Sequence, residues 1–358
     1  EVKVEDIYVP DGQLAGYVPP PAPIDKYLNS NGWFLRDSNW DPDFTKAAPV
    51  IEWFFIQGQE PEVDGIVAVN LNLIKGWLSA VGPIYLSDYQ ETVTADNLWE
   101  KAQAHSEVNF FPGSTQKRDF LSQLGKQLLE KVKTAGWKSQ LQLIEATYRG
   151  LQTKDVFIWL KNDRAQRVMR QLNWDGALMA PDNGNDYLFI VEANLGVNKT
   201  NCCLTRQIKQ EVTVANNQLK ETVRINYQNH NPVTPQPPKL WGGGYKNYLR
   251  LYVPKDTSLE QVKVGGKIVP ASLVTQEKLD GFMVIGLLVN VGGGESQEVE
   301  VSYSRPWQGA TYQLTVQKQS GTNNDPYTLT VHSPTCPEQQ LERNLDEDLT
   351  LQLPFECS

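Results

Sequence analysis

The chain has 358 residues, 40% of them hydrophobic and 10% aromatic, which is enough apolar surface for a folded protein and more chain than one compact core usually organises. Its 33 Lys and Arg residues against 42 Asp and Glu give a net charge of −9. The overall field therefore repels nucleic-acid phosphates and anionic membrane surfaces. We expect at least two domains and no nucleic-acid partner.

The first part of the chain alternates strand-like and helix-like segments. Residues 1–9 follow an interrupted period of two, which predicts an opening strand. Asp43 is a suitable cap for a helix that runs to about Gln57. The apolar run 63–69 predicts a buried strand. Asn70 is a suitable cap for the next predicted helix, which ends at Gly82-Pro83.

The same alternation continues to about residue 185. Helical patterns cover 94–105, 114–136 and 138–149, and they are followed by an apolar strand at 156–160 and a short helix at 163–174. Short apolar strands between helices indicate a sheet covered by helices on both faces. We therefore expect residues 1–185 to form an α/β domain with three layers, α/β/α.

The pattern changes to strands alone from about residue 186. Turn-rich clusters separate eight strand-like segments, which are 187–193, 208–214, 221–228, 248–254, 282–291, 298–305, 311–318 and 327–332. This spacing predicts an antiparallel β-sandwich over 186–333, with 229–244 as a long loop inside it. Residues 334–358 are expected to be an acidic C-terminal tail.

The four cysteines fall into two pairs. Cys202 and Cys203 are adjacent, whereas Cys336 and Cys357 bracket the polar tail. A disulfide between Cys336 and Cys357 would hold that tail in place, and two free thiols are the alternative, so both stay open. Because the sequence has no CxxC and its three histidines are scattered, it does not indicate a zinc site.

One candidate site is a dense group of charged and polar residues, Arg36, Asp37, Asn39, Asp41 and Asp43. Carboxylates this close repel one another unless a cation, an arginine or backbone donors neutralise them. The group is therefore a candidate metal or phosphate-metal site. Alternatively, Asp37 and Asp43 cap a turn and a helix while Arg36 pairs locally.

A second candidate site lies at the start of the long helix. Free backbone N–H groups near Ser114 and Thr115, together with Lys117 and Arg118 in the first turn, could hold an anion such as pyrophosphate. A solvated charged face with Asp119 as partner explains the same residues. No GxSxG, Walker or HExxH motif is present, and His105 is expected to be a solvated helix-end residue.

Several long segments resemble a large bacterial family of envelope proteins of unassigned function. These segments are EDIYVPDGQL, RDSNWDPDF, VDGIVAVNLNLIKGWLSAVGPIYL, TADNLWEKAQ, EVNFFPGSTQKRDFL, DYLFIVEANLGVNKTN and YKNYLRLYVPK. The α/β part also resembles the LytR-CpsA-Psr domain. That resemblance rests on the block from Val63 to Leu86 and on a basic helix start with Lys117 and Arg118, followed by an apolar run.

The LytR-CpsA-Psr resemblance implies a membrane-anchored protein that faces outward and transfers a phosphoglycan from a polyprenyl-pyrophosphate lipid to the cell wall. It implies Mg²⁺ as cofactor, and further strands and a membrane anchor upstream of residue 1. Lys117 and Arg118 match the family's pyrophosphate-binding pair. Asp6 falls near its Arg-Asp motif, but Glu5 stands where that motif has an arginine.

Two functions from different classes follow. The first is an extracytoplasmic cell-surface protein that binds a lipid-linked pyrophosphate glycan or cell-wall polymer. In its enzymatic form, Arg36, Asp37 and Asp41 are catalytic, Asp43 joins the two aspartates around Mg²⁺, and the residues that hold phosphate are Ser114, Thr115, Lys117 and Arg118. The second is a non-catalytic surface or adhesion protein with a degenerate α/β domain and an interacting β-sandwich, which Glu5 and the scarcity of histidine favour.

Overall fold

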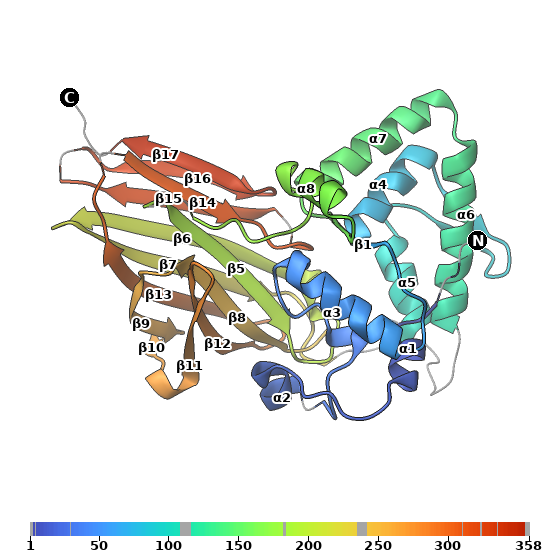
Figure 1. Ribbon diagram of the computed structural model, residues 1–358, viewed down its shortest axis with the longest axis horizontal. Helices are drawn as coiled ribbons and strands as arrows, with labels where there is room; N and C mark the ends of the chain where they lie inside the picture. Colours follow the sequence, from blue (N-terminus) through green and yellow to red (C-terminus); the bar gives the residue numbers. More distant parts are fainter. Residues whose placement is uncertain are drawn as a thin grey trace. The chain divides into compact units, whose positions relative to one another are not determined.

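The computed structural model describes residues 3, 5–28, 30–107, 116–181, 184–234, 242–309, 311–322, 324–334 and 336–354, with the backbone alone at 106–107 and 116–118. These residues fall into two compact units (Figure 1). Among the described residues, unit 1 extends to residue 178 and unit 2 begins at residue 179. The chain is therefore a mixed α and β protein with one helical part and one part made of large sheets.

Helices make up most of unit 1. They are α1 (Tyr8–Gln13), α2 (Ala22–Leu28), the 3₁₀ turn η1 (Leu35–Asp37), α3 (Phe44–Gln57), α4 (Leu71–Val81), α5 (Leu98–Glu107), α6 (Gln116–Thr134), α7 (Trp137–Gln152) and α8 (Asp163–Gln171). Asp43 and Asn70 cap α3 and α4 by accepting hydrogen bonds from Thr45 N–H and Asn72 N–H, as predicted. None of the described helices is long and apolar enough to span a bilayer.

The strands of unit 1 form two small antiparallel pairs. β1 (Gly65–Val69) pairs with β4 (Val156–Leu160), and β2 (Ile84–Leu86) pairs with β3 (Glu91–Val93). One face of the first pair packs on α3, and the second pair contributes to a core with α4, α5 and α6. Among the described residues each of these sheets has two strands, so the expected three-layer sheet is not what the structure shows.

The opening strand predicted over 1–9 is wrong at its C-terminal end. Asp6 Oδ1 accepts a hydrogen bond from Tyr8 N–H at 3.1 Å, and α1 begins at Tyr8. The apolar residues there, Ile7 and Tyr8, are exposed, so no buried face enforces an extended strand. Val2 and Val4 lie outside the described residues.

Unit 2 contains a seven-stranded sheet, β10-β9-β13-β7-β6-β15-β16, and a six-stranded sheet, β11-β12-β8-β5-β14-β17. The strands are β5 (Asp186–Asn194), β6 (Leu204–Ala215), β7 (Gln218–Asn229), β8 (Tyr245–Pro254), β9 (Ser258–Val264), β10 (Lys267–Ile268), β11 (Val274–Leu279), β12 (Phe282–Val291), β13 (Ser296–Pro306), β14 (Thr311–Gln317), β15 (Asp325–His332), β16 (Gln339–Leu345) and β17 (Leu349–Pro354), with 3₁₀ turns η2 (Thr200–Cys203) and η3 (Ala271–Leu273). Each of the eight predicted strand segments lies largely within one of these strands. The expected acidic tail instead contains β16 and β17.

The two sheets of unit 2 share one hydrophobic core. Alternate residues of β6 and β7, such as Ile208 and Val223, lie in the same cluster as Leu249 and Leu251 of β8 and Ile285 of β12, all at most 1% exposed. Most neighbouring strands are antiparallel. β5–β14 and β6–β15 are parallel pairs, which bring together segments far apart in the sequence.

Charged side chains are also buried in this unit, in two groups that each contain one arginine and two carboxyls. Arg206 lies between Glu192 and Asp325, and these three side chains are 6–9% exposed. Arg305 lies beside Asp186 and Glu221, and these three side chains are 0–2% exposed. Because burying a charge is costly unless it is paired, both groups must be neutralised from within the fold.

Candidate functional site

Arg36, a predicted catalytic residue, is held by structural contacts. Its Nη1 lies 2.8 Å from Asp11 Oδ2, and its guanidinium stacks over Phe34 at 4.1 Å from the ring centroid. Asp11 is buried, and its Oδ1 accepts a hydrogen bond from Leu35 N–H at 2.7 Å. Arg36 and Asp11 therefore fix η1 against α1.

The three aspartates predicted to hold Mg²⁺ have separate local contacts. Asp41 Oδ1 accepts a hydrogen bond from Asp43 N–H at 2.9 Å, and Asp43 Oδ1 accepts from Thr45 N–H at 3.0 Å and from Thr45 Oγ1 at 2.6 Å. Asp37 lies 3.6 Å from the Arg36 Nε, and burial raises the pKa of its carboxyl. Within the part of the chain that the structure describes, no group of three or more His, Cys, Asp or Glu side chains could hold a metal ion. Asp43 therefore caps α3, as in the alternative, whereas the backbone hydrogen bond of the preceding turn goes to Asp41 and not to Asp37.

The predicted phosphate site lies mostly outside the described residues. Ser114 and Thr115 are outside them, and Lys117 and Arg118 occupy the first turn of α6 by their backbone alone. The predicted helix start is therefore in place. The side-chain contacts that would distinguish an anion site from a solvated face are not described.

His105, expected as a solvated residue, is packed instead. Its ring stacks on Phe120 of α6 at 4.2 Å between centroids, and Tyr89 contacts it edge-on at 4.9 Å. Its Nε2 lies 3.4 Å from Glu91 Oε2, which also accepts a hydrogen bond from Lys101 Nζ at 2.8 Å. Burial opposes ionisation of Glu91, but its bonds to Lys101 and His105 outweigh this and lower its pKa. The structure thus places a carboxylate, a lysine and a histidine on the elements that pack against α6.

A groove of about 330 Å³ lies between α4 and α7. Asp155 lies in it and accepts hydrogen bonds from Asn72 Nδ2 at 3.1 Å and Thr153 Oγ1 at 2.7 Å. Arg149 and Glu145 of α7 also line the groove. No sequence motif marks these residues, because they come from two helices and the end of a loop.

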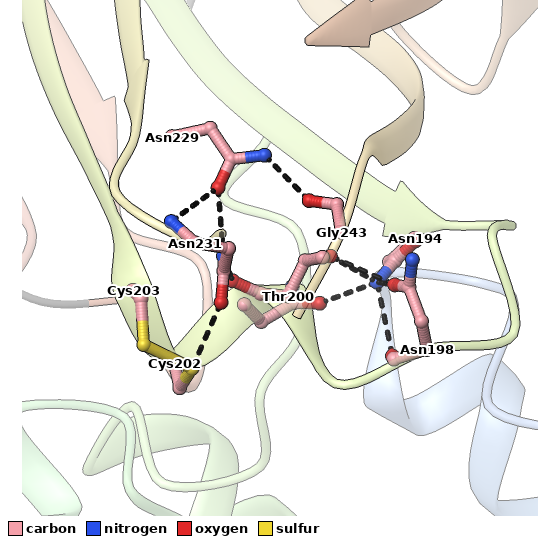
Figure 2. Close-up of a disulfide and its surroundings, with 9 residues drawn as sticks. Asn194, Asn198, Thr200, Cys202, Cys203, Asn229, Asn231 and Gly243 are labelled. Carbon is pink, nitrogen blue, oxygen red and sulfur yellow. Dashed lines mark hydrogen bonds between the residues drawn. A yellow bond between two sulfur atoms is a disulfide. The ribbon is translucent and has the colours of Figure 1, made fainter. Parts of the chain in front are cut away.

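A cluster of polar residues in unit 2 lies beside a disulfide between the adjacent residues Cys202 and Cys203 (Figure 2). We call it the asparagine cluster. Its members come from the end of β5, the following loop, η2, the end of β7 and the segment before β8, and they are Asn194, Asn198, Thr200, Asn201, Asn229, Asn231, Gly243 and Gly244.

Two asparagines organise the cluster. Asn194 Nδ2 donates to Thr200 Oγ1 at 3.0 Å and to Asn198 Oδ1 at 2.9 Å. Asn231 Nδ2 donates to Thr200 O at 2.9 Å and to Asn229 Oδ1 at 2.7 Å. Thr200, Asn229 and Asn231 are almost completely buried, and internal hydrogen bonds hold these residues beside the disulfide.

The loop that joins β5 to the disulfide carries backbone strain. Val197 has φ of 53° and its side chain is 81% exposed. A β-branched residue in the left-handed region is a conformational outlier, and such strain is often found at functional sites. The only sequence signals for this cluster were the adjacent cysteines and the density of asparagine, and our sequence predictions assigned it no role.

In the comparison with known proteins, a family model matches part of the chain. Residues 3–105 match the family described as a protein of unknown function, DUF4012, which fits the expected resemblance to a family of unassigned function. No curated protein matches the chain.

Solved structures give only distant similarity. A proposed nutrient-binding protein from Legionella pneumophila is 9% identical with a TM-score of 0.31, over 47% of this chain and 70% of that one. Leukotriene A4 hydrolase from Saccharomyces cerevisiae is 8% identical with a TM-score of 0.27, over 40% and 27%. An M1 zinc metallopeptidase from Deinococcus radiodurans is 12% identical with a TM-score of 0.22, over 40% and 39%. Values this low carry no argument about fold or function.

Proposed function

We propose that this chain is an extracytoplasmic protein of the cell envelope that binds a phosphorylated glycan without transferring it. The supporting observation for the location is the state of the cysteines: Cys202 and Cys203 are bonded to each other and Cys336 is also disulfide-bonded. Disulfides persist in oxidising compartments outside the cytoplasm. The predicted partner of Cys336, Cys357, lies outside the described residues.

The start of α6 is the proposed binding site for the phosphate groups. Lys117 and Arg118 occupy its first turn, where free backbone N–H groups and the helix dipole also favour an anion. His105 stacks on Phe120 of the same helix, and its Nε2 lies 3.4 Å from Glu91 Oε2, which also accepts a hydrogen bond from Lys101. The LytR-CpsA-Psr resemblance, which is part of this proposal, assigns a lipid-linked pyrophosphate glycan as the ligand.

Binding without transfer is favoured by the contacts of the predicted catalytic residues. Arg36 is committed to Asp11, and Asp41 and Asp43 accept backbone hydrogen bonds within their own turn. Phosphoglycan transfer needs positive charge and a cation around the leaving pyrophosphate. Residues already engaged in holding η1 and capping α3 would have to abandon those contacts to supply it.

The test is binding to vesicles that carry a polyprenyl-pyrophosphate-linked glycan, with Mg²⁺ or with EDTA. We expect binding that the double substitution Lys117→Ala and Arg118→Ala weakens by about tenfold or more, because two charge-assisted contacts are lost. Lys126→Ala, farther along α6 and exposed, is the matched control and should leave binding unchanged. Absence of binding, or equal loss in the control, contradicts the proposed site.

Adding purified cell wall to the same vesicles tests the choice between binding and transfer. We expect no glycan to become covalently attached to the wall. Mg²⁺-dependent attachment that Asp37→Ala abolishes would instead support the phosphoglycan transferase with Arg36, Asp37 and Asp41 as catalytic residues.

A further inference from the structure

The disulfide between Cys202 and Cys203 contributes little to holding the fold together. A disulfide stabilises a protein mainly by restricting the unfolded chain, and the effect grows with the length of the loop that it closes. These two cysteines are adjacent in the sequence, so their bond closes almost no loop. Its presence therefore calls for a reason other than stability.

The atoms around the disulfide are arranged for its reduced form. Asn231 Oδ1 faces Cys202 Sγ at 3.6 Å (Figure 2). Asn231 is 2% exposed, and within the described residues no nitrogen or hydroxyl donates to this oxygen. A disulfide sulfur carries no hydrogen, whereas a thiol is a weak donor. Among the described groups, the thiol of reduced Cys202 is therefore the donor that this buried oxygen would receive.

The rest of the asparagine cluster keeps that oxygen in place whatever the state of the sulfurs. Asn231 Nδ2 is fixed by Thr200 O and Asn229 Oδ1, and His230 N–H donates to Cys203 O at 2.9 Å. None of these bonds uses a sulfur atom. Both cysteines are partly exposed, so a reductant from solvent can reach them.

We propose that Cys202 and Cys203 form a thiol-disulfide exchange site whose reduced form Asn231 stabilises. The co-reactant is a dithiol. One of its thiolates attacks Cys203 Sγ, which forms a mixed disulfide and releases Cys202 as a thiolate that takes up a proton and donates to Asn231 Oδ1. The second thiol of the reductant then attacks the mixed disulfide, leaves as a cyclic disulfide and frees Cys203 as a thiol, so two electrons and two protons pass to the protein.

The experiment titrates the folded chain with dithiothreitol, alkylates the free thiols and identifies the labelled cysteines by mass spectrometry. We expect Cys202 and Cys203 to be labelled at reductant concentrations about tenfold lower than Cys336, because Asn231 Oδ1 favours the reduced form of this pair. The far-ultraviolet circular dichroism should stay unchanged at that point. Labelling of all cysteines together, or unfolding when this pair is reduced, overturns the proposal.

Substitution of Asn231 tests the role of its side-chain oxygen. Asn231→Ala removes the acceptor, so we expect the equilibrium in a buffer of reduced and oxidised dithiothreitol to move about fivefold toward the disulfide. Asn198→Ala, in the same cluster but away from the sulfurs, should leave the equilibrium unchanged. An Asn231→Ala equilibrium equal to that of the parent chain contradicts the assignment.

Asn231→Asp tests the same oxygen if Asn231→Ala does not fold. Asn231→Asp keeps an oxygen beside Cys202 and gives it a charge, and a charged acceptor binds a donor more strongly. We therefore expect its equilibrium to move toward the dithiol. A shift toward the disulfide, or no shift, overturns the role of this oxygen independently of the glycan site on α6.

Discussion

The two buried arginine groups of unit 2 contain the same kinds of residue and differ in how closely they are paired. Arg206 Nη1 lies 2.9 Å from Glu192 Oε2, and Arg206 Nη2 donates to Asp325 Oδ2. Arg305 is looser, since its Nε lies 3.7 Å from Asp186 Oδ1 and 3.7 Å from Glu221 Oε1. Arg206 therefore makes direct hydrogen bonds to both carboxylates. The Nε of Arg305 is too far from either carboxylate for a hydrogen bond.

The pKa values of the side chains follow this difference. Burial lowers the pKa of Arg206, but the charges of Glu192 and Asp325 outweigh this and raise it. Burial raises the pKa of Asp325, which the charges of Arg206 and Lys318 oppose. Glu221 has its pKa raised well above the usual range, first by burial and then by the charge of Asp186.

The comparison shows two ways to neutralise a second buried carboxyl. Around Arg206 two carboxylates are balanced by two cations, because the charge of Lys318 also reaches Asp325. Around Arg305 the raised pKa of Glu221 favours its neutral form, and its carboxyl accepts hydrogen bonds from Gln210 at 2.9 Å and Tyr303 at 3.2 Å. The pKa of a carboxyl is raised in both groups, and farther for Glu221 than for Asp325, so we expect the Arg305 group to respond more strongly to pH.

The largest expected effect is the loss of Arg206. Arg206→Met leaves Glu192 and Asp325 buried without their direct cation, so we expect the free energy of unfolding to fall by about 3–5 kcal/mol. Urea denaturation of the parent chain and the variant measures this change in the free energy of unfolding. Arg224→Met is the matched control, because Arg224 pairs with Glu211 and Glu300 at a partly exposed site and should cost under about 1 kcal/mol. Equal losses would contradict the difference in burial.

The next effect is the pH dependence from Glu221. Because its pKa is raised in the folded state, the folded chain holds a proton that the unfolded chain releases above the usual carboxyl range. The contribution of Glu221 to the free energy of unfolding is thus fully present below the usual pKa range of a carboxyl. It falls as pH rises above that range, by at most about 1.4 kcal/mol per pH unit. Urea unfolding from pH 5 to pH 8 should show this decline in the parent chain and a smaller one in Glu221→Gln. Identical profiles would mean that Glu221 is ionised.

The smallest expected effects come from two buried tyrosine hydroxyls. Tyr227 Oη donates to Glu192 Oε1 at 2.6 Å, whereas Tyr303 Oη donates to Glu221 Oε2 at 3.2 Å. A hydrogen bond to a charged acceptor is worth about 1.5–3 kcal/mol, and one to a neutral acceptor about 1 kcal/mol. We therefore expect Tyr227→Phe to destabilise more than Tyr303→Phe at pH 6. The reverse order would contradict a neutral Glu221.

Local patterns of the sequence were sufficient for most helices and strands. Asp43 and Asn70 were identified as caps because a short polar side chain at that position accepts a backbone bond of the first turn. β9, β11, β16 and β17 were missed, since charged and polar residues interrupt their alternation and β11 and β17 lie at sheet edges with many exposed residues.

The buried charges were also missed, although a signal for them exists. Arg206 is in phase with Ile208 and Val212 along β6, and Glu221 is in phase with Leu219 and Val223 along β7. A period of two places such residues on the same face as the core. The disulfide of Cys202 and Cys203 was beyond the pattern rules, because the contacts of Asn231 that surround it depend on chain segments brought together only by the fold.

The two parallel strand pairs have a consequence for how unit 2 is made. Asp186 of β5 lies opposite Leu314 of β14, and Ile208 of β6 lies opposite Tyr327 of β15. On a ribosome or a translocation channel, one edge of β5 and one edge of β6 therefore stay unpaired until β14 and β15 have emerged. Open apolar edges attract other strands, so a chaperone that shields extended segments would be needed longest here, and a nascent chain stalled before β14 should be especially prone to aggregate.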